Sequence, residues 1–403
     1  TIAAPSMMVP EAAAAGSLYV SAENAMFNNT FGGVQIVEVV VIGHADETDE
    51  AQGEPTVKVY EKQLRMAQAI DGNWYGYFGD DTKISAISTT SQPIGINFGD
   101  DYAPSSFPGG VVEGDFLEAT SVFAPNADSN NDVTILNAPA LSNYNNTDAT
   151  NETVNGGEFK GIGQIGVNEE RWPFIQTYDF SIGLFDVVYE QAGADEVVTL
   201  DYNSADLDDY ASLELDRNSA SQDSEIHLTI TDNQLNIDPT GKDVVIFYVG
   251  ASGSEGVTFQ NRTVASPSVT AYTAFDNSFD DNGKLIINNQ TQGSTNILTM
   301  ATTDDDGTAD NLIVFYETAE NSGIFVNADD SDNSNIEVKT DAKRGYTATF
   351  DYNDSAQSFV VANDFGVLDM DEASVGDEWN SGEALTVTLI DQDLNKNTAS
   401  DED

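Results

Sequence analysis

Asp and Asn side chains occupy alternate positions in several loops of this chain, and these side chains could bind a metal ion. The clearest loop is the one that carries Asp391, Asp393, Asn395 and Asn397. Hard cations such as Ca²⁺ take about six to eight oxygen ligands, and alternate positions of a tight loop can direct side chains to one side while backbone carbonyls supply the rest. This loop therefore predicts a site for Ca²⁺ or another divalent cation.

Further acidic loops are candidates for the same chemistry. An earlier loop carries Asp232, Asn236 and Asp238, with Gln234 in place of the second acid, which lowers the expected affinity. The remaining candidate ligands are Asp46, Asp49, Glu54, Asp128, Asp132, Asp304, Asp306 and Asp310. None of these loops has the Gly and Glu of a complete EF-hand. Because Asp and Asn also form good turns, each loop has a purely structural interpretation, and the prediction is at least one bound divalent ion among them.

Other catalytic chemistry has little support in the sequence. His44 and His227 are the two histidines, and the alternating pattern around His227 predicts a solvent-facing strand residue rather than a general base. Residues 161–166 match the spacing Gly-x-Gly-x-x-Gly, and dinucleotide binding requires a helix directly after such a loop. Pro173 and the strand-like surroundings argue against a helix there. A catalytic pair of glycosidase carboxylates cannot be recognised from the sequence, because Asp and Glu are abundant throughout the chain. We expect no enzymatic activity.

The acidic turns belong to a repeat. Residues 228–238 return as residues 387–397, and each copy follows a second shared block, residues 199–205 in one case and 349–356 in the other. Both main blocks alternate apolar and polar residues before an Asp/Asn-rich turn, which is typical of a half-buried strand that runs into a loop. A weaker copy begins at residues 34–42. Blocks that recur in the same order indicate duplicated β-domains.

Strand-like segments at short intervals, joined by Gly, Asn and Asp turns, predict an all-β fold of tandem immunoglobulin-like β-sandwich domains. We expect an extended segment over 1–16, β-sandwich structure with acidic loops over 17–210, an immunoglobulin-like domain over 211–367, and the start of a further one over 368–403. Only residues 62–70 have a pattern that allows a helical turn. Gly183 and Gly323 are expected to supply turn or bulge geometry, each followed by a core Phe.

The charge of the chain limits its partners. With 69 Asp plus Glu against 14 Lys plus Arg, the formal net charge is −55. Nucleic acid and anionic lipid are therefore improbable partners, and cations are expected to screen the self-repulsion of the fold. There is no Cys, and no apolar run is long enough for a membrane span. We expect a secreted chain whose signal peptide has been removed, with candidate glycosylation at Asn28, Asn145, Asn151, Asn261, Asn289 and Asn353.

Three phrases give a family resemblance: Asp-Gly-Asn-Trp-Tyr-Gly-Tyr-Phe at 71–78, Thr-Asp-Glu-Ala-Gln-Gly-Glu-Pro at 48–55, and the Asp-x-x-Leu-Asn turns. From about residue 17 onward the chain resembles the major surface-layer proteins of marine ammonia-oxidising archaea. The resemblance implies a secreted, glycosylated chain of immunoglobulin-like domains that forms a two-dimensional lattice and binds divalent cations. It also implies the N-terminal portion of a longer product. One departure is that Gly43 and Ala45 stand where the last repeat has Asp391 and Asp393.

The leading hypothesis is thus a structural surface-layer protein, a porous polyanionic lattice of identical chains on the cell surface that enriches cations such as ammonium. The alternative is a calcium-stiffened adhesin or filament subunit. A third class, an exported hydrolase with accessory β-domains, lacks a recognisable catalytic domain here.

Overall fold

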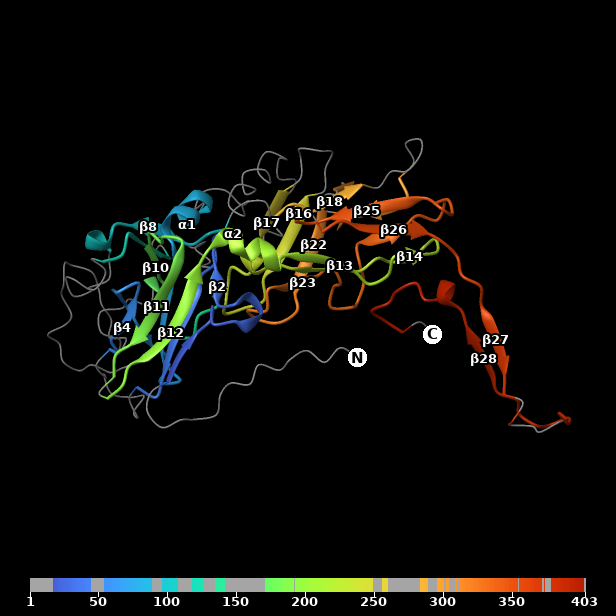
Figure 1. The fold of residues 1–403 in the computed structure, drawn as a ribbon, viewed down its shortest axis with the longest axis horizontal. Coiled ribbons are helices and arrows are strands. Elements are labelled where there is room, and N and C mark those ends of the chain that lie inside the picture. Colours follow the sequence, from blue (N-terminus) through green and yellow to red (C-terminus); the bar gives the residue numbers. More distant parts are fainter. Residues whose placement is uncertain are drawn as a thin grey trace. The chain divides into compact units, whose positions relative to one another are not determined.

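The computed structural model describes residues 17–44, 54–88, 96–107, 118–125, 135–141, 171–191, 193–248, 256–259, 283–288, 296–300, 302–303, 309–310, 312–353, 355–371, 373 and 378–401. Within these residues the protein is mostly β, as predicted (Figure 1). The chain divides into unit 1, residues 1–207 with 236–242, and unit 2, residues 208–235 with 243–403. The residues that we assigned to a further domain, 368–403, are grouped with unit 2.

Unit 1 contains two sheets. The strands of the seven-stranded sheet are, in spatial order, β1 (Ser17–Val20), β3 (Val37–Ile42), β7 (Trp74–Asp80), β10 (Ile175–Tyr178), β9 (Ser121–Ala124) and β8 (Asp100–Tyr102), with β6 (Ala67–Gln68) also on β7. Those of the five-stranded sheet are β2 (Thr30–Phe31), β12 (Glu196–Tyr202), β11 (Gly183–Tyr189), β4 (Val57–Val59) and β5 (Lys62–Leu64). The helical elements are η1 (Ala25–Phe27), α1 (Asp81–Ile87), η2 (Pro104–Ser106) and α2 (Ser204–Leu207).

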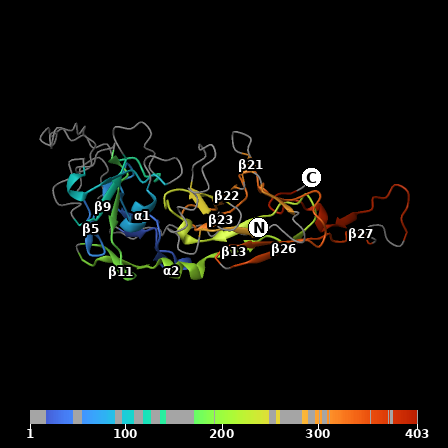
Figure 2. The same cartoon turned by 90° about the horizontal axis from the view of Figure 1, so that it is seen from above.

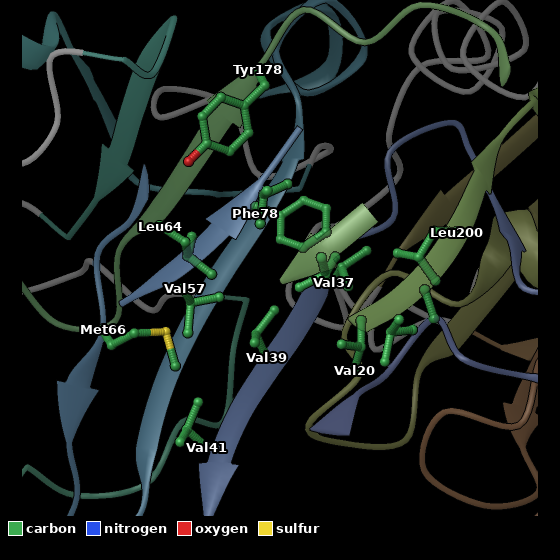
Figure 3. Close-up of a cluster of buried hydrophobic side chains, with 14 of the residues drawn as sticks. Val20, Val37, Val39, Val41, Val57, Leu64, Met66, Phe78, Tyr178 and Leu200 are labelled. Carbon is green, nitrogen blue, oxygen red and sulfur yellow. The ribbon is translucent and has the colours of Figure 1, made fainter. Parts of the chain in front are cut away.

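Both sheets of unit 1 contribute to one hydrophobic core. Alternate residues of β3 are buried there with residues of β4 and β12, as Figure 3 shows for Val39, Val57 and Leu200. Phe31 and Phe180 lie in an aromatic group in this core, with ring centroids 5.5 Å apart. Period-two burial explains why the β-branched stretch that ends at Ile42 forms a central strand.

Unit 2 has a larger number of separate sheets. The six-stranded sheet contains β13 (Ser212–Leu215), β15 (Leu228–Thr231), β23 (Ile324–Val326), β22 (Leu312–Glu317), β16 (Val244–Tyr248) and β17 (Gly256–Phe259), in that order. Figure 2 shows β22 and β23 side by side. The four-stranded sheet contains β14 (Ser219–Ala220), β26 (Gln357–Val361), β25 (Thr347–Asp351) and β18 (Ile286–Asn288). Three strand pairs complete the described part: β19 (Leu298–Met300) with β24 (Ile336–Val338), β20 (Thr302–Thr303) with β21 (Ala309–Asp310), and β27 (Val367–Met370) with β28 (Val387–Ile390).

The repeat seen in the sequence is a structural repeat of three antiparallel hairpins, β1–β3, β13–β15 and β27–β28. Their registers correspond pair for pair, since Leu18 faces Val41, Leu213 faces Ile230 and Leu368 faces Leu389. A 3-10 turn follows the second strand in the later two hairpins, namely η6 (Asn233–Leu235) and η9 (Gln392–Leu394). The sequence repeat is therefore confirmed at the level of strand pairing.

Two local predictions have different outcomes. Gly183 and Gly323 have positive φ values of 129° and 63°, and Phe185 and Phe325 are buried, so the predicted glycine geometry and core contacts are confirmed. The helical turn predicted over residues 62–70 is wrong, because β5 and β6 occupy this stretch. β5 pairs with β4 and β6 pairs with β7, and these cross-strand partners, rather than the pattern within residues 62–70, decide the conformation of the stretch.

Candidate cation-binding turns

The turn after β15 holds Asp232 in a fully buried position. Its Oδ1 accepts a hydrogen bond from the backbone N of Gln234 at 2.8 Å, which shapes the start of η6. Its Oδ2 accepts a hydrogen bond from the Tyr352 hydroxyl, and that hydroxyl accepts one from the backbone N of Gly283 at 3.2 Å. Burial raises the pKa of Asp232 to about 7, although the bonds from Tyr352 and Gln234 act in the opposite direction.

The other two candidate ligands of this turn have different surroundings. Asn236 and Asp238 belong to unit 1, whereas Asp232 belongs to unit 2. Both residues are buried. Oδ1 of Asp238 accepts hydrogen bonds from the backbone N of Thr240 at 2.8 Å and from its Oγ1 at 2.5 Å. This carboxylate therefore caps the short turn that follows it.

The turn after β28 repeats the first bond of the β15 turn. Oδ1 of Asp391 accepts from the backbone N of Asp393 at 3.0 Å, just as Asp232 accepts from Gln234. Oδ1 of Asp393 accepts from the backbone N of Asp364 at 3.1 Å. Each of these carboxylates thus has a backbone donor on one oxygen and leaves a second oxygen for other partners.

The later half of the same turn is tied to the hairpin β13–β15. The guanidinium of Arg217 donates to the carbonyl oxygens of Asn395 and Lys396, both at 2.7 Å. The amide Nδ2 of Asn397 donates to the carbonyl oxygen of Asp332 at 2.6 Å, and its Oδ1 accepts from the backbone N of Ala399 at 2.9 Å. The described partners of these four alternate residues thus differ from one another, and a metal site at this turn stays a prediction.

Glu54, the candidate ligand of the first acidic loop, has a different partner. It forms an ion pair with Arg65, whose side chain is 2% exposed, and its Oε1 accepts from the backbone N of Met66 at 2.6 Å. The backbone of Asp310 lies in β21, and its side chain lies outside the described part of the structure. The remaining candidates lie outside the described residues: Asp46, Asp49, Asp128, Asp132, Asp304 and Asp306.

Across the residues that the structure describes, no group of three or more His, Cys, Asp and Glu side chains is arranged to hold a metal ion. The described turns supply at most isolated carboxylates together with amide and carbonyl oxygens. Calcium can use such oxygens, so the cation prediction stays a prediction, with Asp391 and Asp393 as its best-placed carboxylates.

The two histidines have structural partners. Nδ1 of His44 lies 2.7 Å from the Tyr189 hydroxyl. His227 lies immediately before β15, with its side chain 11% exposed and its Nδ1 at 3.0 Å from Oγ1 of Thr398, so it is largely covered and not solvent-facing as predicted. Burial acts to raise the pKa of the neighbouring Asp216, but hydrogen bonds from His227 and Thr398 bring that pKa below its usual value. The glycine-rich loop 161–166 lies outside the described residues.

Two of the six candidate glycosylation sites are described. Asn28 is exposed at the end of η1 with φ 52°. Asn353 is half-buried, and the Nδ2 atom that would carry a glycan donates to the carbonyl oxygen of Asp208 at 2.8 Å. Asn145, Asn151, Asn261 and Asn289 lie outside the described residues.

The sequence interpretation missed the role of Tyr352. It noted the repeated Asp-Tyr-Asn block as a sign of duplication, but not that this Tyr contacts the acidic turn of its own unit. The ring of Tyr352 also packs against Phe247, with centroids 5.8 Å apart.

No model of a protein family matches the sequence, and no curated protein matches it either. None of the helices in the described part is long and apolar enough to cross a membrane.

Proposed function

We propose that this protein is a structural subunit of a cell-surface layer, a secreted chain of tandem immunoglobulin-like β-sandwich domains that assembles with identical chains into a porous, polyanionic lattice. The observation that carries the proposal is the threefold hairpin repeat with matching register. Tandem copies of one β-module are a common design for extended structural proteins, because each copy adds length and surface without new chemistry.

The charge supports a role for cations in assembly. At a net charge of −55, neighbouring chains repel one another unless counterions gather between them. Divalent ions are the most effective, and the acidic turns at Asp391 and Asp393 would hold some of them. Such a lattice also concentrates small cations, ammonium included, by attraction to fixed charge alone.

Electron microscopy of the purified full chain tests this proposal. In millimolar calcium we expect two-dimensional sheets with rotational symmetry, and excess chelator should disperse them. A chain that stays monomeric with and without calcium, as judged by sedimentation, would overturn the lattice proposal.

The turn variants Asp391→Asn and Asp393→Asn test the part of the turns in cation binding. We expect weaker calcium binding by calorimetry and a higher calcium requirement for assembly. Asp341→Asn is the matched control, because Asp341 is an exposed acid outside the repeated turns. Equal losses in all three variants would mean that calcium acts only as a diffuse counterion.

A calcium-stiffened adhesin or filament subunit is the second candidate, favoured by the tandem order of the hairpins along the chain. The same micrographs separate the candidates, since single fibres would appear in place of sheets.

A further inference from the structure

The turn between β24 and β25, residues 339–345, gathers basic side chains in a chain that has few of them. Lys339, Lys343 and Arg344 are three of the 14 Lys and Arg residues, against 69 Asp and Glu. Lys343 and Arg344 are exposed, and Lys339 is half-buried. Asp341 is the one acid of this stretch. We call residues 339–345 the basic turn, since they form a positively charged patch on a strongly negative protein.

The positive charge of the basic turn is not neutralised by neighbouring acids. Within the part of the chain that the structure describes, none of its three basic side chains forms an ion pair. Arg344 donates to the carbonyl oxygen of Asn363 at 2.8 Å, and the ammonium of Lys343 lies 5.9 Å from the centre of the Tyr346 ring. Basic residues elsewhere do pair with a carboxylate, namely Lys58, Arg65 and Arg217. The charge of the basic turn is therefore available to a partner.

The backbone of the basic turn is fixed by contacts within unit 2. The buried Ala342 donates from its N to the carbonyl oxygen of Lys339 at 3.0 Å, and its own carbonyl oxygen accepts from Nε2 of Gln222 at 2.8 Å. Gly345, with φ 83°, donates from its N to the carbonyl oxygen of Val361 in β26 at 2.7 Å. A fixed backbone presents the basic side chains with little further loss of backbone entropy on binding.

The other end of β24 carries the opposite charge. Residues 328–333, which precede β24, include the exposed acids Asp329, Asp330 and Asp332 and no basic residue, and we call this stretch the aspartate turn. Oδ1 of Asp329 accepts from the backbone N of Ser331 at 2.8 Å. None of the three acids forms an ion pair with a described residue. β24 has three residues and spans about 10 Å, so a negative and a positive turn lie at opposite ends of one short strand.

We infer that the basic turn docks on the aspartate turn of a second copy of this chain, so that copies associate head to tail through the two ends of β24. The guanidinium of Arg344 has further donors for a carboxylate besides the one that it gives to Asn363, and the ammonium of Lys343 adds a point charge. The two turns are different surfaces, so the contact is heterologous and each bound copy keeps one turn free for the next. This inference rests on the proposed association of identical chains, and it adds a contact that joins them.

Screening by salt determines when this contact forms. The net charge of −55 makes two copies repel at long range. At physiological ionic strength the Debye length is about 8 Å, so distant charges are screened while groups in contact still attract. Association should therefore be strongest at intermediate salt, and weaker both at about 0.01 M, where the Debye length is about 30 Å, and at about 1 M, where it is about 3 Å. Screening of the net charge alone would instead make association rise steadily with salt.

Sedimentation equilibrium of the full chain in chelator, over this range of salt, measures the association. The basic-turn variant, Lys343→Glu with Arg344→Glu, reverses the charge of its turn and should weaken self-association by about tenfold or more. The aspartate-turn variant, Asp330→Lys with Asp332→Asn, removes the charge of the other turn and should weaken self-association as much. Asn tolerates the positive φ of 60° at position 332. The two variants change the net charge in opposite directions, so weaker association in both excludes an effect of net charge.

A mixture of the two variants guards against misfolding and isolates the contact. The basic-turn variant keeps an intact aspartate turn, and the aspartate-turn variant keeps an intact basic turn. We expect the equimolar mixture to form heterodimers with the affinity of the wild type and no larger species, because each copy then has a single functional turn. The wild type should continue to larger species as its concentration rises.

Wild-type association that neither variant weakens would overturn this inference and leave the lattice proposal standing. A chain that stays monomeric at every salt and calcium concentration would overturn both. Opposite effects of the two variants would assign the association to net charge and contradict a contact between the turns. Binding of a soluble polyuronate that the basic-turn variant abolishes, without self-association of the wild type, would show that the partner is an acidic carbohydrate instead of a second copy.

Discussion

The hydroxyl of Tyr352 donates a hydrogen bond to Oδ2 of Asp232, and both side chains are fully buried in unit 2. The two residues come from the two blocks that recur together in the sequence. The hydroxyl of Tyr352 thus joins the end of β25, in the four-stranded sheet, to the turn after β15, in the six-stranded sheet.

Substitution Tyr352→Phe should lower the free energy of unfolding of unit 2 by about 1–3 kcal/mol. It leaves the ring against Phe247 but removes the hydroxyl donor to a buried carboxylate. Urea denaturation followed by circular dichroism measures the change. Tyr346→Phe is the control, because that half-exposed Tyr lies near Lys343 instead of a buried acid. Equal effects of the two variants would contradict a special role for the Tyr352 hydroxyl.

The buried carboxyl of Asp232 should make the stability of unit 2 depend on pH. Burial raises its pKa from 3.8 to about 7. The folded-state pKa lies above the unfolded one, so the native state binds more protons between these values, and this contribution to stability is lost as pH rises from about 4 to about 7. The variant Asp232→Asn should remove up to about 4 kcal/mol of this pH dependence.

Denaturation of wild type and Asp232→Asn across that pH range checks this prediction, since the difference between them cancels the general effect of the acidic surface. Asp341→Asn should keep the wild-type slope. If Asp232→Asn also keeps the wild-type slope of stability against pH, the carboxyl of Asp232 is ionised in the folded protein across this pH range.

Glu54 should act as the partner of Arg65 in the native state. The Arg65 side chain is 2% exposed, so Glu54→Gln removes a negative charge that contacts a buried guanidinium and should cost up to about 3–5 kcal/mol of stability. Glu190→Gln breaks the more exposed pair with Lys58 and should change stability much less. Thermal unfolding in chelator and in calcium measures both. A loss in Glu54→Gln that appears only in calcium would support the metal-ligand role instead.

The positions of several strands could be predicted from the sequence, because the alternation of apolar and polar residues is a local property. The weaker repeat copy that begins at residues 34–42 contains β3, and the later copies that begin at residues 228 and 387 start with β15 and β28. The helical turn predicted over residues 62–70 was wrong because contacts with other parts of the chain decide the conformation of this stretch. Arg65 is buried there by its contact with Glu54, and its backbone N donates to the side chain of Gln176, more than a hundred residues away.

The candidate turns show a different limit of sequence patterns. Alternation places side chains on one side only while the chain stays extended, and the 3-10 turn η9 interrupts the extended chain between Asp391 and Asn395. The polar bonds of this turn then direct Asp393 toward the backbone of Asp364. The composition of the turn was visible in the sequence, whereas the direction of each side chain depends on partners elsewhere in unit 2.

Glycosylation should discriminate between the two described acceptors. Asn28 is exposed at the end of a 3-10 turn, so a glycan there meets solvent. A glycan on Asn353 would disrupt the hydrogen bonds from its Nδ2 to the carbonyls of Asp208, at 2.8 Å, and Ala211, at 3.4 Å. Mass spectrometry of the chain secreted from a glycosylating host should find Asn28 modified and Asn353 unmodified. The matched variants Asn28→Gly and Asn353→Gly, which accommodate the positive φ of 52° and 49° at these positions, should differ in stability, with a loss of about 1–2 kcal/mol only for Asn353. Modification of Asn353 in the folded chain, without loss of stability, would show that these two bonds are dispensable.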